Sequence, residues 1–134
     1  PDDGPAISTQ RPVVETADDA ELQSDLQEPV IIGREQVRTF MQQDSVVLVD
    51  ARLPEEFKAS TIPGAVNIPF DRLGEYVDKL DALPKDKWII TFCDGPPCEK
   101  SVMLAYEIFN QGYPKVAIYY DGLEDWQAEY GGES

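Results

Sequence analysis

Both cysteines of the chain lie in one short loop, and this loop holds the residues best suited to chemistry. Cys93 and Cys98 are separated by four residues. The loop consists of Cys93, Asp94, Gly95, Pro96, Pro97, Cys98, Glu99, Lys100 and Ser101. The thiolate form of cysteine is a strong nucleophile that forms covalent intermediates. The loop therefore predicts thiolate chemistry, with Cys93 as the nucleophile.

The chain of 134 residues contains no histidine. This composition excludes Ser-His-Asp and Cys-His catalysis, imidazole acid/base chemistry and histidine-rich metal sites. A Cys-x4-Cys pair without histidine or a second cysteine pair would need carboxylates to bind zinc, so we expect no metal and no other cofactor. The chemistry must therefore use thiols, carboxylates, lysine, arginine or backbone amides.

The segments on either side of the loop predict an α/β domain. Short apolar runs are typical of strands, and apolar residues at spacings of three and four are typical of helices. The expected strands are 30–32, 45–49, 62–69, 88–92 and 116–120, and the expected helices are 34–43, 53–59, 71–80, 99–110 and 122–129. The fourth expected element of each kind flanks the loop. The third expected helix should begin at an Asp71 cap and bury Leu73, Tyr76, Val77 and Leu80. We expect about five mostly parallel strands flanked by helices on both faces.

Cys93 directly follows the fourth expected strand, and the loop leads into the fourth expected helix. Ligands of open α/β sheets bind at the carboxyl ends of the strands. A loop that bends into a helix points backbone N–H groups at its own centre, and the helix dipole adds positive charge there. Gly95 allows close backbone approach, Pro96 and Pro97 stiffen the turn, and Lys100 adds a cation at the rim. A thiolate or persulfide is expected to be stabilised in this cradle.

Several other segments resemble the rhodanese family. Segments 50–57 (Asp-Ala-Arg-Leu-Pro-Glu-Glu-Phe) and 62–69 (Ile-Pro-Gly-Ala-Val-Asn-Ile-Pro) look like its Asp-x-Arg and Ile-Pro-Gly-Ala-x-Asn-Ile-Pro motifs. Segment 111–114 is similar to its usual turn, and segment 121–126 to its closing Gly-Gly-x-x-x-Trp motif. The resemblance extends from about residue 31 to residue 131. It implies the three-layer rhodanese-like fold.

The resemblance implies a sulfurtransferase of the thiosulfate type. Cys93 would attack the outer sulfur of thiosulfate or another small sulfane anion, release sulfite, and hold a persulfide for cyanide or a thiol acceptor, which could be a protein. The backbone amides of the loop would stabilise the anion. Arg52 would lie near the loop as a brace or an attractor of anions. Alternatively, it would form a structural ion pair with Asp50, Glu55 or Glu56.

The loop departs from the Cys-x-x-Gly-x-Arg-Ser pattern of single-domain rhodaneses. It is two residues longer up to Ser101, and Lys100 takes the place of the arginine. Thr61 takes the place of a histidine whose role is expected to be structural. Cys98 could resolve a persulfide or sulfenic acid on Cys93 into a disulfide, could itself be the nucleophile, or could be incidental.

Two rival functions use the same loop. A phosphatase of the Cys-x5-Arg type is disfavoured, because Glu99 stands six residues after Cys93 and would repel phosphate. The position six residues after Cys98 is Leu104, which cannot bind an anion. The alternative to an enzyme is a non-catalytic rhodanese-like module that binds a partner or senses oxidation through a Cys93–Cys98 disulfide.

The chain divides into an expected acidic leader or linker, residues 1–29, and an expected rhodanese-like domain, residues 30–134. Its 26 acidic and 11 basic residues give a formal net charge of −15, which disfavours nucleic acid and anionic membranes as partners. No apolar run approaches the roughly 18–20 residues of a membrane span, so we expect no membrane insertion in this segment. The acidic leader and the start at Pro1 favour an exported, periplasmic or membrane-tethered bacterial domain, with a fragment of a cytoplasmic protein as the alternative.

Overall fold

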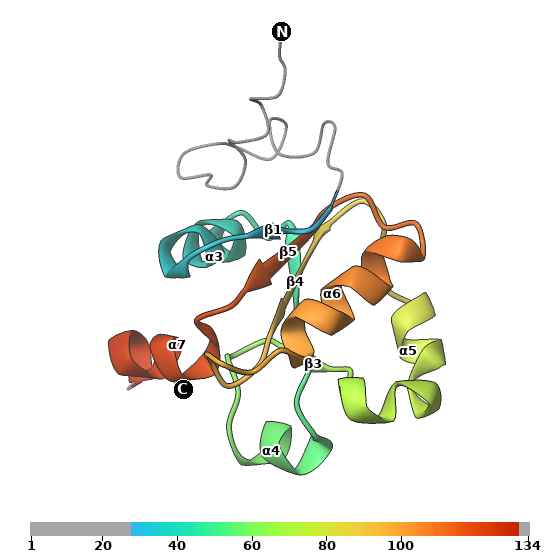
Figure 1. The fold of residues 1–134 in the computed structure, drawn as a ribbon. Coiled ribbons are helices and arrows are strands. Elements are labelled where there is room, and N and C mark those ends of the chain that lie inside the picture. The colour runs from blue at the N-terminus through green and yellow to red at the C-terminus, as the bar shows by residue number, and fades with distance from the viewer. Residues whose placement is uncertain (1–27, 132–134) are drawn as a thin grey trace, which may run out of the picture.

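The computed structural model describes residues 28–131, so the expected leader lies outside the described residues except for its last two positions. Five strands form one sheet, and every neighbouring pair is parallel. The strands are β1 (Val30–Ile31), β2 (Val46–Asp50), β3 (Val66–Asn67), β4 (Trp88–Phe92) and β5 (Val116–Tyr119). Their order in the sheet is β1-β5-β4-β2-β3, and Figure 1 labels all of them except β2. The predicted fold class is confirmed.

The helices cover both faces of this sheet. They are α3 (Arg34–Gln42), α4 (Pro54–Ala59), α5 (Val77–Asp81), α6 (Lys100–Asn110) and α7 (Gly122–Tyr130), with a 3-10 helix η1 (Phe70–Glu75). Residues of α3 and α7 belong to one buried cluster, and residues of α5 and α6 belong to another. Within residues 28–131, no helix is long and apolar enough to cross a membrane.

Strand β4 lies in the middle of the sheet and supplies both clusters. All five of its residues are buried. Trp88, Ile90 and Phe92 pack on the side of α3 and α7, and Ile89 packs on the side of α6. This alternation is the period of two that a strand imposes on its side chains. Burial on both faces explains the continuous apolar run, and it makes β4 a rigid support for whatever follows its last residue.

The segment expected as one helix over 71–80 is two shorter elements, η1 and α5. Arg72 leaves the helical backbone region with φ −127° and ψ 31°. Gly74 follows in the same turn, and glycine disfavours a helix by about 1 kcal/mol. The expected Asp71 cap is wrong, because Pro69 is the residue that precedes η1. Val77 was expected inside but is 48% exposed, since the break rotates the second half of the segment. Of the other three expected core residues, Leu80 is buried, and Leu73 and Tyr76 are partly buried and pack against the same cluster.

The strand expected over 62–69 is reduced to β3. Residues 62–65 form a turn instead, in which the N–H of Ala65 donates to the carbonyl of Ile62 at 3.1 Å. Gly64 in this turn has φ +88°, a conformation that favours glycine. Only the end of the motif therefore pairs with β2.

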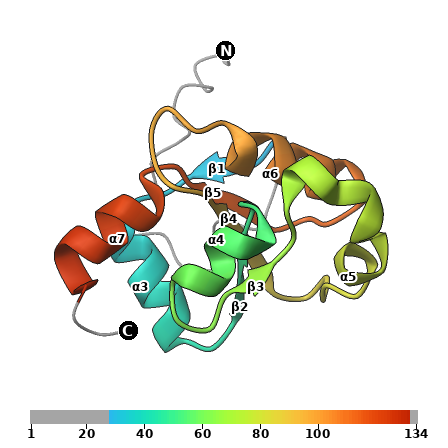
Figure 2. The same cartoon turned by 90° about the horizontal axis from the view of Figure 1, so that it is seen from below.

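Three strands of the sheet end at the same level. Asp50 of β2 is paired with Phe92 of β4, and Phe92 is paired with Tyr119 of β5. Because the strands are parallel, the residues that follow each of them meet at one edge of the sheet. Figure 2 shows the domain from the side on which α4 lies, with α7 and the start of α6 nearby. The cysteine loop begins at this edge.

Candidate functional site

The two cysteines of the loop are joined by a disulfide. Their Cα atoms are 6.5 Å apart, within the usual range of about 4.4–6.8 Å for a bridged pair. Cys93 is 1% exposed, and Cys98 is half-buried. The structure therefore shows the loop in its oxidised form, with the Cys93 side chain buried.

The loop turns back on itself between the two cysteines. The N–H of Cys98 donates to the carbonyl of Gly95 at 2.8 Å, and Gly95 has φ +140°. The Pro96–Pro97 peptide is cis. Helix α6 begins at Lys100, one residue later than expected, so Cys98 precedes the helix. This turn carries Cys98 back to Cys93 at the end of β4.

The first turn of α7 forms backbone hydrogen bonds with the start of the loop. The N–H groups of Leu123 and Glu124 donate to the carbonyls of Cys93 and Asp94, each at 2.9 Å. Gly122 has φ +69°, and a Cβ atom there would lie 2.5 Å from the carbonyl oxygen of Cys93. The two backbones are therefore in direct contact. The resemblance of segment 121–126 to a family motif did not reveal this contact, although the glycine in that motif is a signal of close backbone approach.

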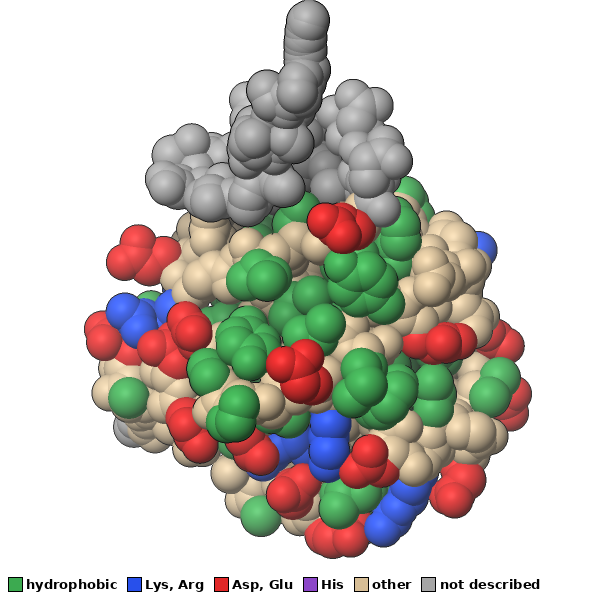
Figure 3. Space-filling view, in the orientation of Figure 1, with side chains coloured by type: hydrophobic (Ala, Val, Ile, Leu, Met, Phe, Trp, Pro, Cys, Tyr) green, Lys and Arg blue, Asp and Glu red, His purple; other side chains and the backbone are tan. Residues whose placement is uncertain are grey.

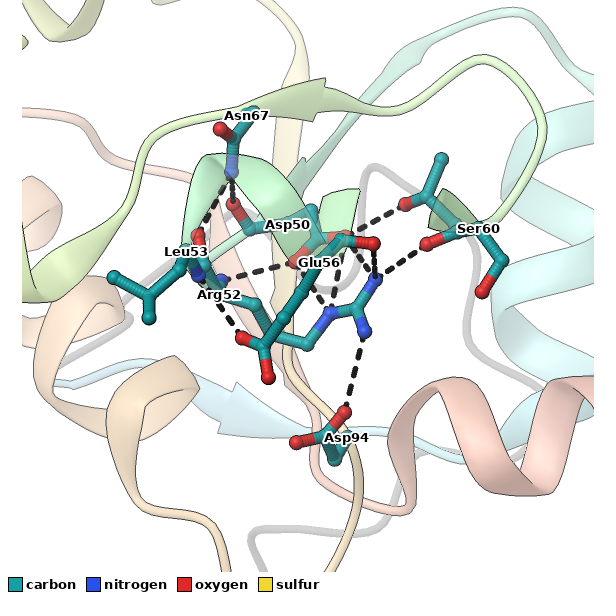
Figure 4. Close-up of polar contacts among 8 residues, drawn as sticks. Asp50, Arg52, Leu53, Glu56, Ser60, Asn67 and Asp94 are labelled. Carbon is teal, nitrogen blue, oxygen red and sulfur yellow. Dashed lines mark hydrogen bonds and ion pairs between the residues drawn. The ribbon is translucent and has the colours of Figure 1, made fainter. Parts of the chain in front are cut away.

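Arg52 connects the end of β2 to the loop (Figure 4). Its Nε and Nη2 donate to the carboxylate of Asp50 at 3.1 and 3.0 Å. Nη2 also donates to the carbonyl of Ser60 at 2.5 Å, and Nη1 donates to Oδ1 of Asp94 at 3.3 Å. Arg52 is 5% exposed and Asp50 is fully buried. The two expected alternatives are thus combined, because the arginine is in a structural ion pair and also contacts the loop.

The buried Asp50 carboxylate is held by further donors. Thr61 Oγ1 donates to Oδ2 at 2.7 Å, and the N–H of Arg52 donates to Oδ1 at 2.9 Å. Asn67 Nδ2 donates to the carbonyls of Asp50 and Arg52. Burial lowers the pKa of Arg52, but the hydrogen bonds and charge of Asp50 outweigh it, so the pKa is raised and the guanidinium stays charged. Such hydrogen bonds offset the cost of taking two charges out of water.

The other two acidic residues considered as partners of Arg52 have different contacts. Glu55 pairs with Arg72 on the surface at 3.3 Å. The carboxylate of Glu56 accepts the N–H of Leu53 at 3.2 Å, and only its backbone carbonyl contacts Arg52. Of these three acidic side chains, only that of Asp50 therefore forms an ion pair with Arg52.

The remaining loop residues differ in exposure. Gly95 and Ser101 are buried, Asp94 and Lys100 are half-buried, and Pro96, Pro97 and Glu99 are exposed. Lys100 Nζ is paired with Asp71 of η1 at 2.8 Å. On the face shown in Figure 3, hydrophobic side chains gather at the centre, and acidic side chains are scattered around and among them. The loop thus offers an anion little unpaired positive side-chain charge.

Ser101 has a buried hydroxyl without a hydrogen-bond partner among the described residues. It lies in the first turn of α6. Its carbonyl accepts the hydroxyl of Thr91, from β4, at 2.9 Å. A buried hydroxyl without a partner costs about 1–3 kcal/mol, so a polar group that enters the loop could regain that energy.

A cleft of about 510 Å³ lies beside the loop, between the starts of α3 and α7. Asp121 and Asp125 line it, but no residue of the loop 93–101 does. Two of its charged side chains are paired with each other, because Arg34 Nη1 donates to Asp125 at 2.8 Å. Asp125 also accepts the hydroxyl of Tyr119 at 2.6 Å. Within the part of the chain that the structure describes, no group of three metal-ligating side chains is present. The loop, rather than this cleft, remains the candidate site.

Comparison with known proteins finds one domain family whose model matches most of the chain. The family model of the Rhodanese-like domain matches residues 34–129. The HTH-type transcriptional regulator Rv0324 of Mycobacterium tuberculosis is 37% identical over 82 residues, which cover 61% of this chain and 34% of that protein. The tRNA uridine(34) hydroxylase of Acinetobacter baylyi is 38% identical over 91 residues, which cover 64% of this chain and 29% of that protein. The chain therefore spans about a third of the length of these relatives.

A solved structure is matched over most of its length. The single domain sulfurtransferase RDL2 of Saccharomyces cerevisiae superposes with a TM-score of 0.60 and 26% sequence identity. The match covers 80% of this chain and 95% of that one. A stand-alone sulfurtransferase thus has nearly the whole of its fold in common with this chain.

Proposed function

Because the chain belongs to the rhodanese-like domain family, we propose that it is a sulfurtransferase in which Cys93 carries the transferred sulfur as a persulfide. The Cys93 thiolate attacks the outer sulfur of a sulfane donor such as thiosulfate. The sulfur–sulfur bond of the donor breaks, and sulfite leaves with its electron pair. Cyanide or a thiol then attacks the outer sulfur of the persulfide and restores the thiolate. The likeness to a single domain sulfurtransferase supports this reaction type.

The single observation that carries the assignment of Cys93 is its backbone position. It is the first residue after the buried central strand β4, and α7 binds its carbonyl at 2.9 Å. Cys98 lies at the other end of the turn, directly after two exposed prolines, and is half-buried. A covalent nucleophile needs a fixed position relative to its donor. The more firmly held thiol is therefore the better carrier.

The anion would be stabilised by groups of the loop rather than by a cationic side chain. Pro96 and Pro97 have no N–H, so the available amides come from Asp94, Gly95 and the first turn of α6. The buried hydroxyl of Ser101, which has no partner among the described residues, is a further donor for the persulfide. Both interactions favour the charged form of a persulfide or thiolate.

Arg52 acts as a positioning residue in this proposal. Most of its guanidinium is occupied by the buried Asp50 carboxylate and by the Ser60 carbonyl. Its remaining contact is with Asp94, the residue after Cys93. In this proposal Arg52 therefore holds the loop through Asp94 and does not contact the sulfur donor.

The disulfide favours a second candidate function, in which the domain is a redox-responsive module. Oxidation would bury and block Cys93, and reduction would free it. A module of this kind would need no sulfur donor. The two functions make different predictions for the reduced protein.

The test is thiocyanate formation from thiosulfate and cyanide, measured on the reduced wild type, Cys93→Ser and Cys98→Ser, with circular dichroism to verify folding. We expect activity in Cys98→Ser and none in Cys93→Ser, and activity in the wild type when a dithiol keeps its two cysteines reduced. Activity in Cys93→Ser together with its loss in Cys98→Ser would make Cys98 the carrier. Absence of thiocyanate from all three proteins, with thiosulfate and with polysulfide, would reject the sulfurtransferase and leave the redox module.

A further inference from the structure

The disulfide and the contacts that support the loop are present together in the structure. With Cys93 and Cys98 bridged, α7 donates to the carbonyls of Cys93 and Asp94 at 2.9 Å. Arg52 contacts Asp94, and the Cys98 N–H donates to the carbonyl of Gly95. The Cys98 sulfur therefore reaches the Cys93 sulfur from within an intact, folded loop.

Cys98 also has better access to Cys93 than an external acceptor has. Cys93 is 1% exposed when the bridge is formed, and Cys98, which is bonded to it, is half-buried. Two groups joined by a short flexible linker meet at an effective concentration of about a millimolar. The turn that joins Cys98 to Cys93 has only four residues between them and is held by a hydrogen bond, so the Cys98 thiol is at least as concentrated near Cys93. A thiol from solution must compete with this neighbour.

We infer that Cys98 is the first acceptor for the persulfide on Cys93, and that the chain releases the sulfur as hydrosulfide. This inference rests on the proposed function. The Cys98 thiol gives its proton to the outer sulfur of the persulfide anion, and the resulting Cys98 thiolate attacks the inner sulfur, which is the Sγ atom of Cys93. The bond between that atom and the outer sulfur breaks, hydrosulfide leaves with the electron pair, and the Cys93–Cys98 disulfide forms. Hydrosulfide is a weaker base than an alkyl thiolate, and the weaker base leaves faster.

A dithiol reductant, either a small molecule or a protein, then completes the cycle. Its first thiol attacks the disulfide to form a mixed disulfide, and its second thiol releases the chain with both cysteines reduced. Over one cycle, thiosulfate and the dithiol give sulfite, hydrogen sulfide and the oxidised reductant. The disulfide in the structure is the state before this reduction.

The experiment is a single turnover without reductant. The wild type and Cys98→Ser are reduced, freed of reductant and mixed with thiosulfate. Sulfite and sulfide are measured, sulfide by trapping with a bimane reagent, and the protein mass is recorded. We expect the wild type to release sulfide equal to sulfite and to end about 2 Da lighter than the reduced chain. Cys98→Ser should release sulfite only and keep a gain of about 32 Da.

Other results overturn the inference in distinguishable ways. A wild type that keeps a gain of about 32 Da and releases no sulfide would show that Cys98 does not resolve the persulfide, and the proposed function would stand. A persulfide mapped to Cys98 in the wild type would show transfer of the outer sulfur instead of its release. If neither protein releases sulfite or gains sulfur, with thiosulfate and with polysulfide, the proposed function itself fails.

Discussion

Gly122→Ala tests whether α7 positions the cysteine loop. The new Cβ atom would lie 2.5 Å from the carbonyl oxygen of Cys93. The closest ordinary contact between carbon and oxygen is about 3.3 Å, so one backbone must move away by about 0.8 Å. One partner of this contact is the backbone of Cys93 itself, so the movement changes the distance between α7 and the cysteine loop.

The effect on activity follows from this displacement. A misplacement of about 1 Å can cost on the order of 100-fold in rate, so we expect kcat/KM for thiosulfate to fall by about 30- to 100-fold. Stability should also fall. A non-glycine residue at positive φ costs about 1–2 kcal/mol, and overpacking costs about 1–3 kcal/mol. The assay is thiocyanate formation at a temperature at which circular dichroism shows the variant to be folded.

Gly64→Ala is the matched control. Gly64 also has a positive φ, +88°, but a Cβ atom there meets nothing within 4 Å. We expect it to lose about 1–2 kcal/mol of stability and no activity when folded. If folded Gly122→Ala is as active as Gly64→Ala, the contact with α7 does not position Cys93 and the reasoning is wrong.

Three further predictions concern charge and burial. Arg52→Ala leaves the Asp50 charge buried without its partner and should cost about 3–5 kcal/mol in urea unfolding. Arg72→Ala, which removes an exposed pair, should cost less than about 0.5 kcal/mol, and equal costs would contradict the buried role of Arg52. Burial and the Asp125 hydrogen bond raise the pKa of Tyr119, so the native state keeps a proton that the unfolded state loses above about pH 10. The stability advantage of wild type over Tyr119→Phe should therefore be constant below about pH 9 and shrink above pH 10, by up to about 1.4 kcal/mol per pH unit, and an unchanged difference in urea unfolding would refute this. The formal charge of −15 repels the thiosulfate dianion, so kcat/KM should rise a few-fold when sodium chloride is raised from about 0.01 to 0.15 M, and a fall would reveal an attractive cationic site.

The sheet could be predicted because its central strands are set by burial. The continuous apolar runs of β2 and β4 are what two-sided burial requires; β4 appears where expected, and β2 begins and ends one residue later than expected. The break between η1 and α5 was missed, because the apolar spacing around it fits one helix. The backbone leaves the helical region at Arg72, and Gly74 disfavours a helix, but the apolar spacing contains neither of these local effects.

The place of the cysteine loop in the fold was predictable, but its contacts were not. The position of Cys93 follows from the end of β4, which the sequence marks clearly. The contact of Arg52 with Asp94 depends on the pairing of Asp50 with Phe92, which joins segments far apart in the chain. The spacing of the cysteines left three roles open for Cys98. The direction of its side chain depends on the backbone of Gly95 and of the two prolines, which spacing does not encode.

The most direct measurement is the location of the transferred sulfur. Reduced Cys98→Ser, which cannot form the disulfide, is treated with thiosulfate that carries an isotope label in its outer sulfur. The protein is then digested and its peptides are weighed. We expect the labelled sulfur, a gain of about 32–35 Da depending on the isotope, on the peptide that contains Cys93, and no gain in Cys93→Ser. A folded, reduced Cys98→Ser that binds no label, or Cys93→Ser that retains it, would contradict the role of Cys93 as the sulfur carrier.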